Sequence, residues 1–323
     1  MSDNRKEILE WIEQGRIQSG SLPAALRLAG LSPSRAEWRN FFQSLTFWLG
    51  IVFFAAAVIF FFAFNWQAMG RLAKFGLVEI VLITSVVLCW QLDLNRVPGK
   101  GSLLFATLLV GALLALAGQT YQTGADTYEL FGIWAIAILP WVVVSFFSPL
   151  WLVWLGLINL TVILYYQTFG GWFGFLFDTE KILWALFILN TIALCCWEFS
   201  AYSGVRWLRE RWSARILAVF SGSLITVLAV WAVLDFQADK AVTLLVYSIW
   251  MTAAYGVYRH VLMDVFVLAG GVLSAIIVIT VWLSEQMLKH SDGGAFLFIG
   301  FIIIGLSAAG GFWLKSVVNG AKK

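Results

Sequence analysis

The sequence predicts an all-α fold, a polytopic transmembrane helix bundle preceded by a small N-terminal cytosolic helical segment. Of the 323 residues, 61% are hydrophobic and 12% are charged, whereas a soluble domain is about 45–50% apolar and about 25% charged. The apolar residues form continuous runs close to the ~20 residues that cross a bilayer as a helix. The runs lack the alternation of barrel strands, so helices are expected to satisfy the backbone in lipid.

The first 43 residues are expected to be a separate, mostly polar segment. It should contain an amphipathic helix over residues 4–14 and a second short helix over residues 22–29, after which Ser32 and Pro33 are expected to open the helix leading into the first span. A cleaved signal peptide is not expected, because the segment has no short apolar stretch with a small-residue cleavage site. The segment is too small for a stable core of its own, so we expect it to pack on the membrane or on cytosolic loops.

Ten spans are expected to follow. The predicted organisation is an N-terminal segment over residues 1–43, a transmembrane domain over residues 44–316 and a basic tail over residues 317–323. The spans are expected at about 44–64, 72–92, 102–118, 129–147, 150–167, 181–199, 214–234, 241–258, 262–283 and 294–314.

The basic residues predict the orientation, because Lys and Arg accumulate on the cytoplasmic side. With the N-terminus inside, sixteen of the 21 Lys and Arg residues lie on the cytoplasmic side and five lie outside. Both termini are then cytoplasmic. Residues 204–215, where Trp and Leu alternate with Arg, predict either a short helix on the inner leaflet that attracts anionic lipid or a cluster that only sets topology. Residues 169–177 are expected to dip into the outer headgroup layer, and Pro140 is expected to kink the fourth span.

A polar segment over residues 118–131 interrupts two long apolar runs and is expected to form the rim of a polar pocket on the outer side of the bundle. Glu79 lies about two turns into the second span, and an ionisable group at membrane depth is a functional candidate by default. The predicted substrate-binding residues are Asn65, Glu79, Gln119, Tyr121 and Asp126.

Each of these candidates also has a structural interpretation. Asp126 and Glu129 have the spacing of a capping device at the start of the fourth span. Glu79 could form a structural hydrogen bond or ion pair with another helix, since Lys74 lies about 140° away around its own helix. His260 and Asp264 are four residues apart and could form a structural contact on the inner side.

Catalytic, cofactor and metal motifs are not found in the sequence. HExxH, GxSxG and GxGxxG are missing, and the two histidines, His260 and His290, lie at opposite ends of the ninth span. Cys89, Cys195 and Cys196 fall in apolar runs and are interpreted as small core residues rather than a disulfide framework. We therefore expect no enzyme activity, no cofactor and no nucleic-acid partner.

The sequence resembles a bacterial membrane-protein family known as domain of unknown function 2157. The resemblance rests on Trp11, Gly15 and Ile17 in the N-terminal segment, on the pair Asn65-Trp66, and on Gly118-Gln119-x-Tyr121 followed by Asp126 and Leu130-Phe131. It covers roughly residues 5–150 and continues beyond them only as hydrophobic spans. The resemblance implies a polytopic protein of the inner (cytoplasmic) membrane and implies no activity.

Three hypotheses for function follow. The first is a transporter that takes a small polar solute through the outer pocket, with proton coupling through Glu79; the two halves of five spans show no convincing inverted repeat in support of it. The second is a non-transporting sensor or scaffold that uses residues 1–43 to contact a cytosolic protein partner. The third is an intramembrane enzyme that acts on lipid-linked substrates, with Asp126, Glu129, Asp178 and Glu180 as the available acids. Membrane lipids are expected partners in each case, and the oligomeric state is left open.

Overall fold

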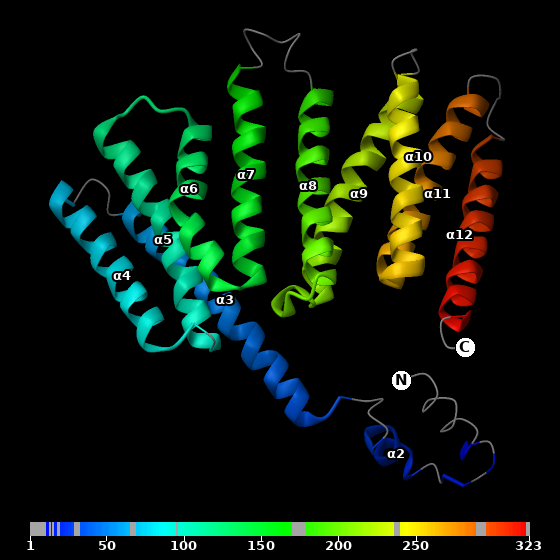
Figure 1. Cartoon of the computed structure of the whole chain (residues 1–323), viewed down its shortest axis with the longest axis horizontal. Coiled ribbons are helices and arrows are strands. Elements are labelled where there is room, and N and C mark those ends of the chain that lie inside the picture. Colours follow the sequence, from blue (N-terminus) through cyan, green and yellow to red (C-terminus); the bar gives the residue numbers. More distant parts are fainter. Residues whose placement is uncertain are drawn as a thin grey trace. The chain divides into compact units, whose positions relative to one another are not determined.

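The computed structural model of the chain consists of α-helices joined by turns (Figure 1). It describes residues 11–12, 14, 16–17, 20–28, 33–64, 69–94, 96–169, 179–235, 240–288 and 295–320. Over these ranges there is no β-strand, which confirms the predicted all-α fold. The predictions made for residues 4–14, for Asn65 and for residues 169–177 fall wholly or largely outside the described residues.

Within the described ranges, ten helices are long and apolar enough to cross a membrane, in agreement with the ten predicted spans. A short helix, α2 (Leu22–Leu28), precedes them, a 3₁₀ turn, η1 (Arg206–Leu208), lies before α9, and a π-helical turn, η2 (Val257–Val261), continues α10. The ten are α3 (Arg35–Phe64), α4 (Arg71–Gln91), α5 (Val97–Tyr121), α6 (Thr127–Ser145), α7 (Ser148–Phe169), α8 (Thr179–Tyr202), α9 (Arg211–Leu234), α10 (Lys240–Gly256), α11 (Val265–Leu288) and α12 (Ala295–Gly320).

The chain divides into two compact units, Met1–Leu116 and Ala117–Lys323. In the first unit, α3 begins with a capping box. The backbone N–H of Glu37 donates to Oγ of Ser34 at 3.1 Å, and the backbone N–H of Ser34 donates to Oε2 of Glu37 at 2.6 Å. The first helical residue is therefore Arg35 rather than the expected Pro33, because Ser34, unlike Ser32, has a glutamate three residues later.

Helices α3, α4 and α5 pack together in this first unit. Val78 of α4 and Leu116 of α5 are buried against each other, with Val58 of α3 alongside. Gly101 allows α5 to approach α3 closely, since a Cβ at this position would lie 2.7 Å from Cζ of Phe47. A larger residue at position 101 would push the two helices apart.

In the second unit, neighbouring helices pack in pairs along the chain. Helix α6 packs on α7, α8 on α9, and α11 on both α9 and α12. Ile225 and Leu228 of α9 are almost fully buried, and they pack against Leu186 and Phe187 of α8. Helix α9 is thus covered on several sides, by α8, α10 and α11, and forms the centre of this unit.

Helices α6 and α7 form a tight antiparallel pair. Pro140 lies inside α6, as the sequence indicates, and the helix continues to Ser145. The chain then reverses at Phe146, whose φ of 45° and ψ of 41° are left-handed. Nε1 of Trp154 in α7 donates to the carbonyl oxygen of Ala135 at 3.0 Å and joins the two helices about one and a half turns before the proline.

Candidate functional site

Three of the five predicted site residues lie in or beside the connection between α5 and α6, in the second unit. Gln119 and Tyr121 belong to the last turn of α5, Asp126 precedes α6, and all three side chains are exposed. Asp126 occupies the N-cap position, as predicted, but its side chain makes no capping hydrogen bond. The Glu129 carboxylate does not complete a capping box; its Oε1 accepts from the Tyr128 hydroxyl at 3.4 Å.

Glu79 lies in the first unit, on the exposed side of α4. The buried residues of this helix are Lys74, Val78, Ser85 and Cys89, which recur at the spacing of one helical face. Glu79 follows Val78 directly and therefore points about 100° away from that face. Lys74 and Glu79 therefore lie on different faces of α4, as their sequence spacing predicts. The lysine is on the buried face and the glutamate is on the exposed face.

The five predicted residues accordingly belong to separate parts of the structure. Gln119, Tyr121 and Asp126 share one connection, Glu79 belongs to the other compact unit, and Asn65 is outside the described residues. The pocket that they were expected to form stays a prediction.

A cluster of two buried carboxylates and two partly exposed arginines, which the sequence analysis did not identify, lies in the second unit. Nη1 of Arg211 donates to Oε2 of Glu198 at 2.7 Å, and Nε of Arg211 donates to Oδ2 of Asp264 at 3.1 Å. Nε of Arg215 donates to both oxygens of Asp264, at 2.9 Å and 3.2 Å. The Tyr258 hydroxyl donates to Oε1 of Glu198 at 2.9 Å. We call these five residues the charged cluster.

The charged cluster joins four elements. Glu198 lies near the end of α8, the arginines lie in the first two turns of α9, Tyr258 lies in η2, and Asp264 precedes α11. The side chains of Asp264 and Glu198 are only 2% and 10% exposed. Two carboxylates face two guanidinium groups, so the formal charges cancel. Removal of Arg211 would leave the buried Glu198 carboxylate without its cationic partner.

Asp264 has a second role as the N-cap of α11. Its Oδ1 accepts a hydrogen bond from the backbone N–H of Phe266 at 3.1 Å. Burial opposes ionisation of Asp264, but hydrogen bonds from Arg215 and Arg211 outweigh it and hold the pKa of this carboxyl below its usual range. Asp264 is therefore ionised at neutral pH and fixes the start of α11 to α9.

The turn between α10 and α11 places Tyr258 and Asp264 in the cluster. A π-helical turn is rare, and η2 adds one to the end of α10 over five residues. Met263 follows with a φ of 38°, in the left-handed region that favours glycine. The backbone N–H of Asp264 donates to the carbonyl oxygen of Tyr258 at 3.1 Å and holds this corner. Such local strain persists where surrounding contacts determine the conformation.

Further polar side chains inside the second unit pair between helices. Asn159 of α7 and Asn190 of α8 exchange amide hydrogen bonds at 3.2 Å and 2.6 Å. On α9 and α11, Thr226 and Ser274 share a hydrogen bond of 2.6 Å, and the Tyr247 hydroxyl of α10 is 2.9 Å from Ser274. Hydrogen bonds of this kind hold helices together where water is scarce.

The paired polar groups of the second unit are arranged to stabilise the helix packing rather than to carry out a reaction. Among the residues that the structure describes, no group of three or more His, Cys, Asp or Glu side chains could hold a metal ion. The carboxylates of the charged cluster are occupied by arginines, and Glu180 forms an ion pair with Lys240 in another part of the unit. The expectation of no enzyme activity stays a prediction.

The structure differs from two expectations for these residues. A separate helix on the inner leaflet over residues 204–215 is not formed, because Arg211 and Arg215 begin α9 and bind carboxylates. The alternative, a charge cluster that only sets topology, stays a prediction. Asp264 was paired with His260, but it binds the two arginines, and His260 instead makes an edge-to-face ring contact with Tyr255. The local signal for the cluster is the spacing of the arginines by four residues, which places both on one helix face but does not identify the carboxylates that they bind.

Residues 9–151 match the family model described as "Predicted membrane protein (DUF2157)". This match confirms the resemblance noted from the sequence. Neither the curated proteins nor the solved structures give a significant match. The matched region ends within α7, so every member of the charged cluster lies beyond it.

Proposed function

We propose that this chain, whose residues 9–151 match the model of a membrane-protein family of unknown function, is a non-transporting membrane scaffold or sensor. The observation that carries the proposal is the pairing of buried polar groups in the second unit. Charges that a transporter would present to a solute or a proton are here engaged with one another, between α8, α9, η2 and the start of α11.

The same pairing extends along the helices. Asn159 with Asn190, and Thr226 with Ser274, connect α7 to α8 and α9 to α11. Alternating access requires groups of helices to rock against each other around a site. Each rocking step in this unit would break an interhelical hydrogen bond or an ion pair whose carboxylate is buried, and this cost opposes the movement. A unit built in this way favours one conformation.

The orientation belongs to the same proposal. The bias of Lys and Arg supports a cytoplasmic position for both termini and for the charged cluster, and the family resemblance supports a bacterial inner membrane. The N-terminal segment would then face the cytosol and contact a protein partner. Exposed apolar side chains on this segment and on the start of α3, among them Leu28 at 91% exposure and Trp38 at 49%, support such a contact.

The proposal is tested by measuring distances within the second unit. Spin labels on Tyr202→Cys and Val261→Cys, both exposed positions, report the separation of α8 from η2. Cys195 and Cys196 are exposed and are replaced by alanine beforehand. In liposomes with and without an imposed pH gradient, a scaffold gives one narrow distance distribution. A second population that grows with the gradient would contradict the proposal.

The partner contact is tested separately. A photo-crosslinking amino acid at Leu28 in the full-length protein is expected to give adducts with a soluble polypeptide in cells. The same amino acid at Phe301, an exposed position of α12, serves as the control and is expected to give lipid adducts. Lipid adducts at both positions would contradict the contact.

A transporter of a small polar solute is the second candidate. It is favoured by the exposed Gln119, Tyr121 and Asp126 around one helix connection, together with Glu79 in an apolar helix. For a transporter, Asp126→Asn and Glu79→Gln should abolish thermal stabilisation by a solute from a panel of amino acids and sugars, with normal expression. Misfolding of both variants would instead indicate capping and packing roles.

A further inference from the structure

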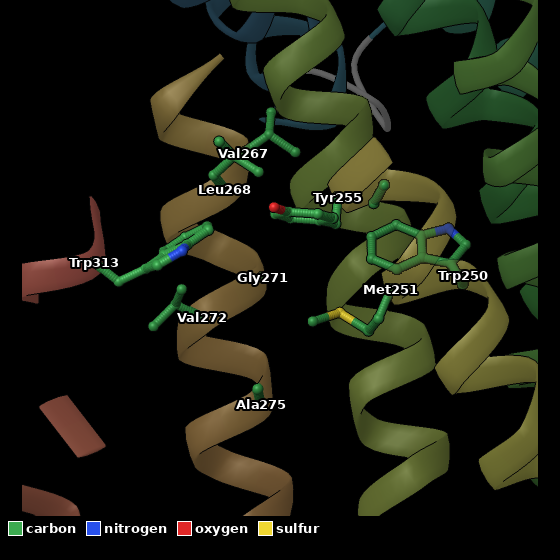
Figure 2. Close-up of a pocket in the computed structure, with 10 residues that line it drawn as sticks. Trp250, Met251, Tyr255, Val267, Leu268, Gly271, Val272, Ala275 and Trp313 are labelled. Atoms are coloured by element: carbon green, nitrogen blue, oxygen red, sulfur yellow. The ribbon is translucent and has the colours of Figure 1, made fainter. Parts of the chain in front are cut away.

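An apolar cavity of about 150 Å³ lies between α10, α11 and α12 (Figure 2). Trp250, Met251 and Tyr255 line it from α10, Val272 lines it from α11, and Trp313 closes it from α12. Its walls are aliphatic, aromatic and thioether groups. A cavity of this size and character excludes water and accepts apolar ligands.

The surroundings of the cavity determine which apolar ligand is available. All three helices are long and apolar enough to cross a membrane. In a bilayer such helices are surrounded by hydrocarbon, where lipid chains are the solvent. An acyl chain is therefore the occupant that the cavity meets at the highest concentration.

A cation borders one end of the cavity. Arg259 lies one turn after Tyr255, and its Nη1 is 3.5 Å from the carbonyl oxygen of Val317, which lies one turn after Trp313. Its Nη2 approaches the position of a Cβ at Gly320 to 3.8 Å. Arg259 thus spans from η2 to the last turns of α12.

The charge of Arg259 is not balanced by a carboxylate in the described part of the chain. Its side chain is partly buried, and its recorded partners are a carbonyl oxygen and the sulfur of Met263 at 3.8 Å. A desolvated guanidinium gains most from an anion with several oxygens, and phosphate suits its planar fork.

We propose that this cavity and Arg259 bind one anionic phospholipid, with an acyl chain between α10, α11 and α12 and the phosphate on the Arg259 guanidinium. The predicted orientation places Arg259 at the cytoplasmic end, so the lipid comes from the inner leaflet. The choice of leaflet rests on the proposed orientation, but the site itself uses none of the residues of the scaffold or transport role proposed above.

Two matched pairs of variants test the site. Gly271→Leu fills the cavity, since a Cβ there faces Cε of Met251 at 3.5 Å, whereas Gly270→Leu adds the same side chain where no atom lies within 4 Å. Arg259→Gln removes the cation, and Arg209→Gln removes an exposed arginine elsewhere on the same predicted side. Ala275→Leu, also within the cavity lining, is a second filling variant if Gly271→Leu does not fold.

The measurement is native mass spectrometry of the delipidated full-length protein titrated with dioleoylphosphatidylglycerol or dioleoylphosphatidylcholine. We expect one phosphatidylglycerol to bind the wild type preferentially, and Arg259→Gln and Gly271→Leu to weaken it about tenfold or more, equivalent to at least 1.4 kcal/mol. The controls Gly270→Leu and Arg209→Gln should bind as the wild type does. Equal binding of the two lipids, or unchanged binding in either test variant, would overturn the proposal.

Discussion

Tyr258 and Glu198 are 60 residues apart in the sequence, and the tyrosine hydroxyl donates to Oε1 of the glutamate at 2.9 Å. Both residues are buried, with 3% and 8% of their whole-residue surface exposed. The same glutamate accepts from Arg211 through its other oxygen. One short contact thus connects the end of α8 to η2 and stabilises a carboxylate that would otherwise be costly to bury.

Removal of this hydroxyl tests the role of the contact. Tyr258→Phe should lower the free energy of unfolding by about 1.5–3 kcal/mol, the range for hydrogen bonds to charged groups. Thermal and denaturant unfolding in detergent measure the change. Tyr202→Phe is the control, because Tyr202 is 73% exposed. Equal losses in the two variants would mean that the contact with Glu198 contributes little.

Acid should lower the free energy of unfolding, because Asp264 becomes protonated. Hydrogen bonds from the arginines hold the folded-state pKa of this carboxyl below its usual range. The unfolded chain, whose aspartates have a pKa of about 3.9, therefore takes up the proton first as the pH falls. The stabilisation is complete above about pH 5 and is lost progressively below about pH 4.

The pH dependence is measured as the melting temperature of detergent-solubilised protein from pH 6 to pH 3. Asp264→Asn should be less stable at pH 6 and should show a shallower decline in acid. Asp126→Asn is the control, since Asp126 is exposed and should leave the profile unchanged. If the melting temperature of Asp264→Asn fell in acid as steeply as that of the wild type, carboxylates other than Asp264 would be responsible for the acid sensitivity.

Substitution of the N-cap residues of α3 and α6 by alanine should destabilise the two helix starts to different extents. Ser34→Ala removes the capping hydrogen bond to Glu37 and should cost about 1 kcal/mol locally. Asp126→Ala should cost only a few tenths, because its side chain makes no capping bond. Hydrogen exchange of the Glu37 and Glu129 amides reports each helix start. The prediction would be contradicted if Asp126→Ala accelerated exchange at Glu129 more than Ser34→Ala accelerated exchange at Glu37.

The amide pair Asn159 and Asn190 should behave as one unit. Either single Asn→Leu substitution leaves the other buried amide without its partner and should cost about 1 kcal/mol. The double Asn159→Leu, Asn190→Leu variant should be no less stable than the worse single variant, since both polar groups are then gone. Unfolding of all four proteins closes the double-mutant cycle. Additive losses would indicate that the amides do not interact.

The helices were predictable because their signal is local. A run of apolar residues must span the bilayer as a helix whatever its neighbours are, and all ten expected spans are helices here. The start of α3 was less predictable, since Ser32 and Ser34 both qualify as caps. Glu37 decides between them by completing a capping box with Ser34.

The charged cluster was not predictable in the same way. Glu198, Arg211, Arg215 and Asp264 each lie near the end of a helix, where an isolated charge is typical of a topology signal. Their partners in the charged cluster are up to 60 residues away. Nothing in a local pattern distinguishes a charge that faces lipid headgroups from one that faces another helix.

The sequence by itself determined that this is an all-α membrane protein with ten apolar helices, because hydrophobic length and the hydrogen-bonding needs of the backbone are properties of each segment. Only the tertiary structure decided which side of each helix is buried. It placed Lys74 inside its unit and Glu79 on the surface, and it brought Arg211 to Asp264. These outcomes depend on the rotation and pairing of helices, which arise from packing between segments far apart in the chain.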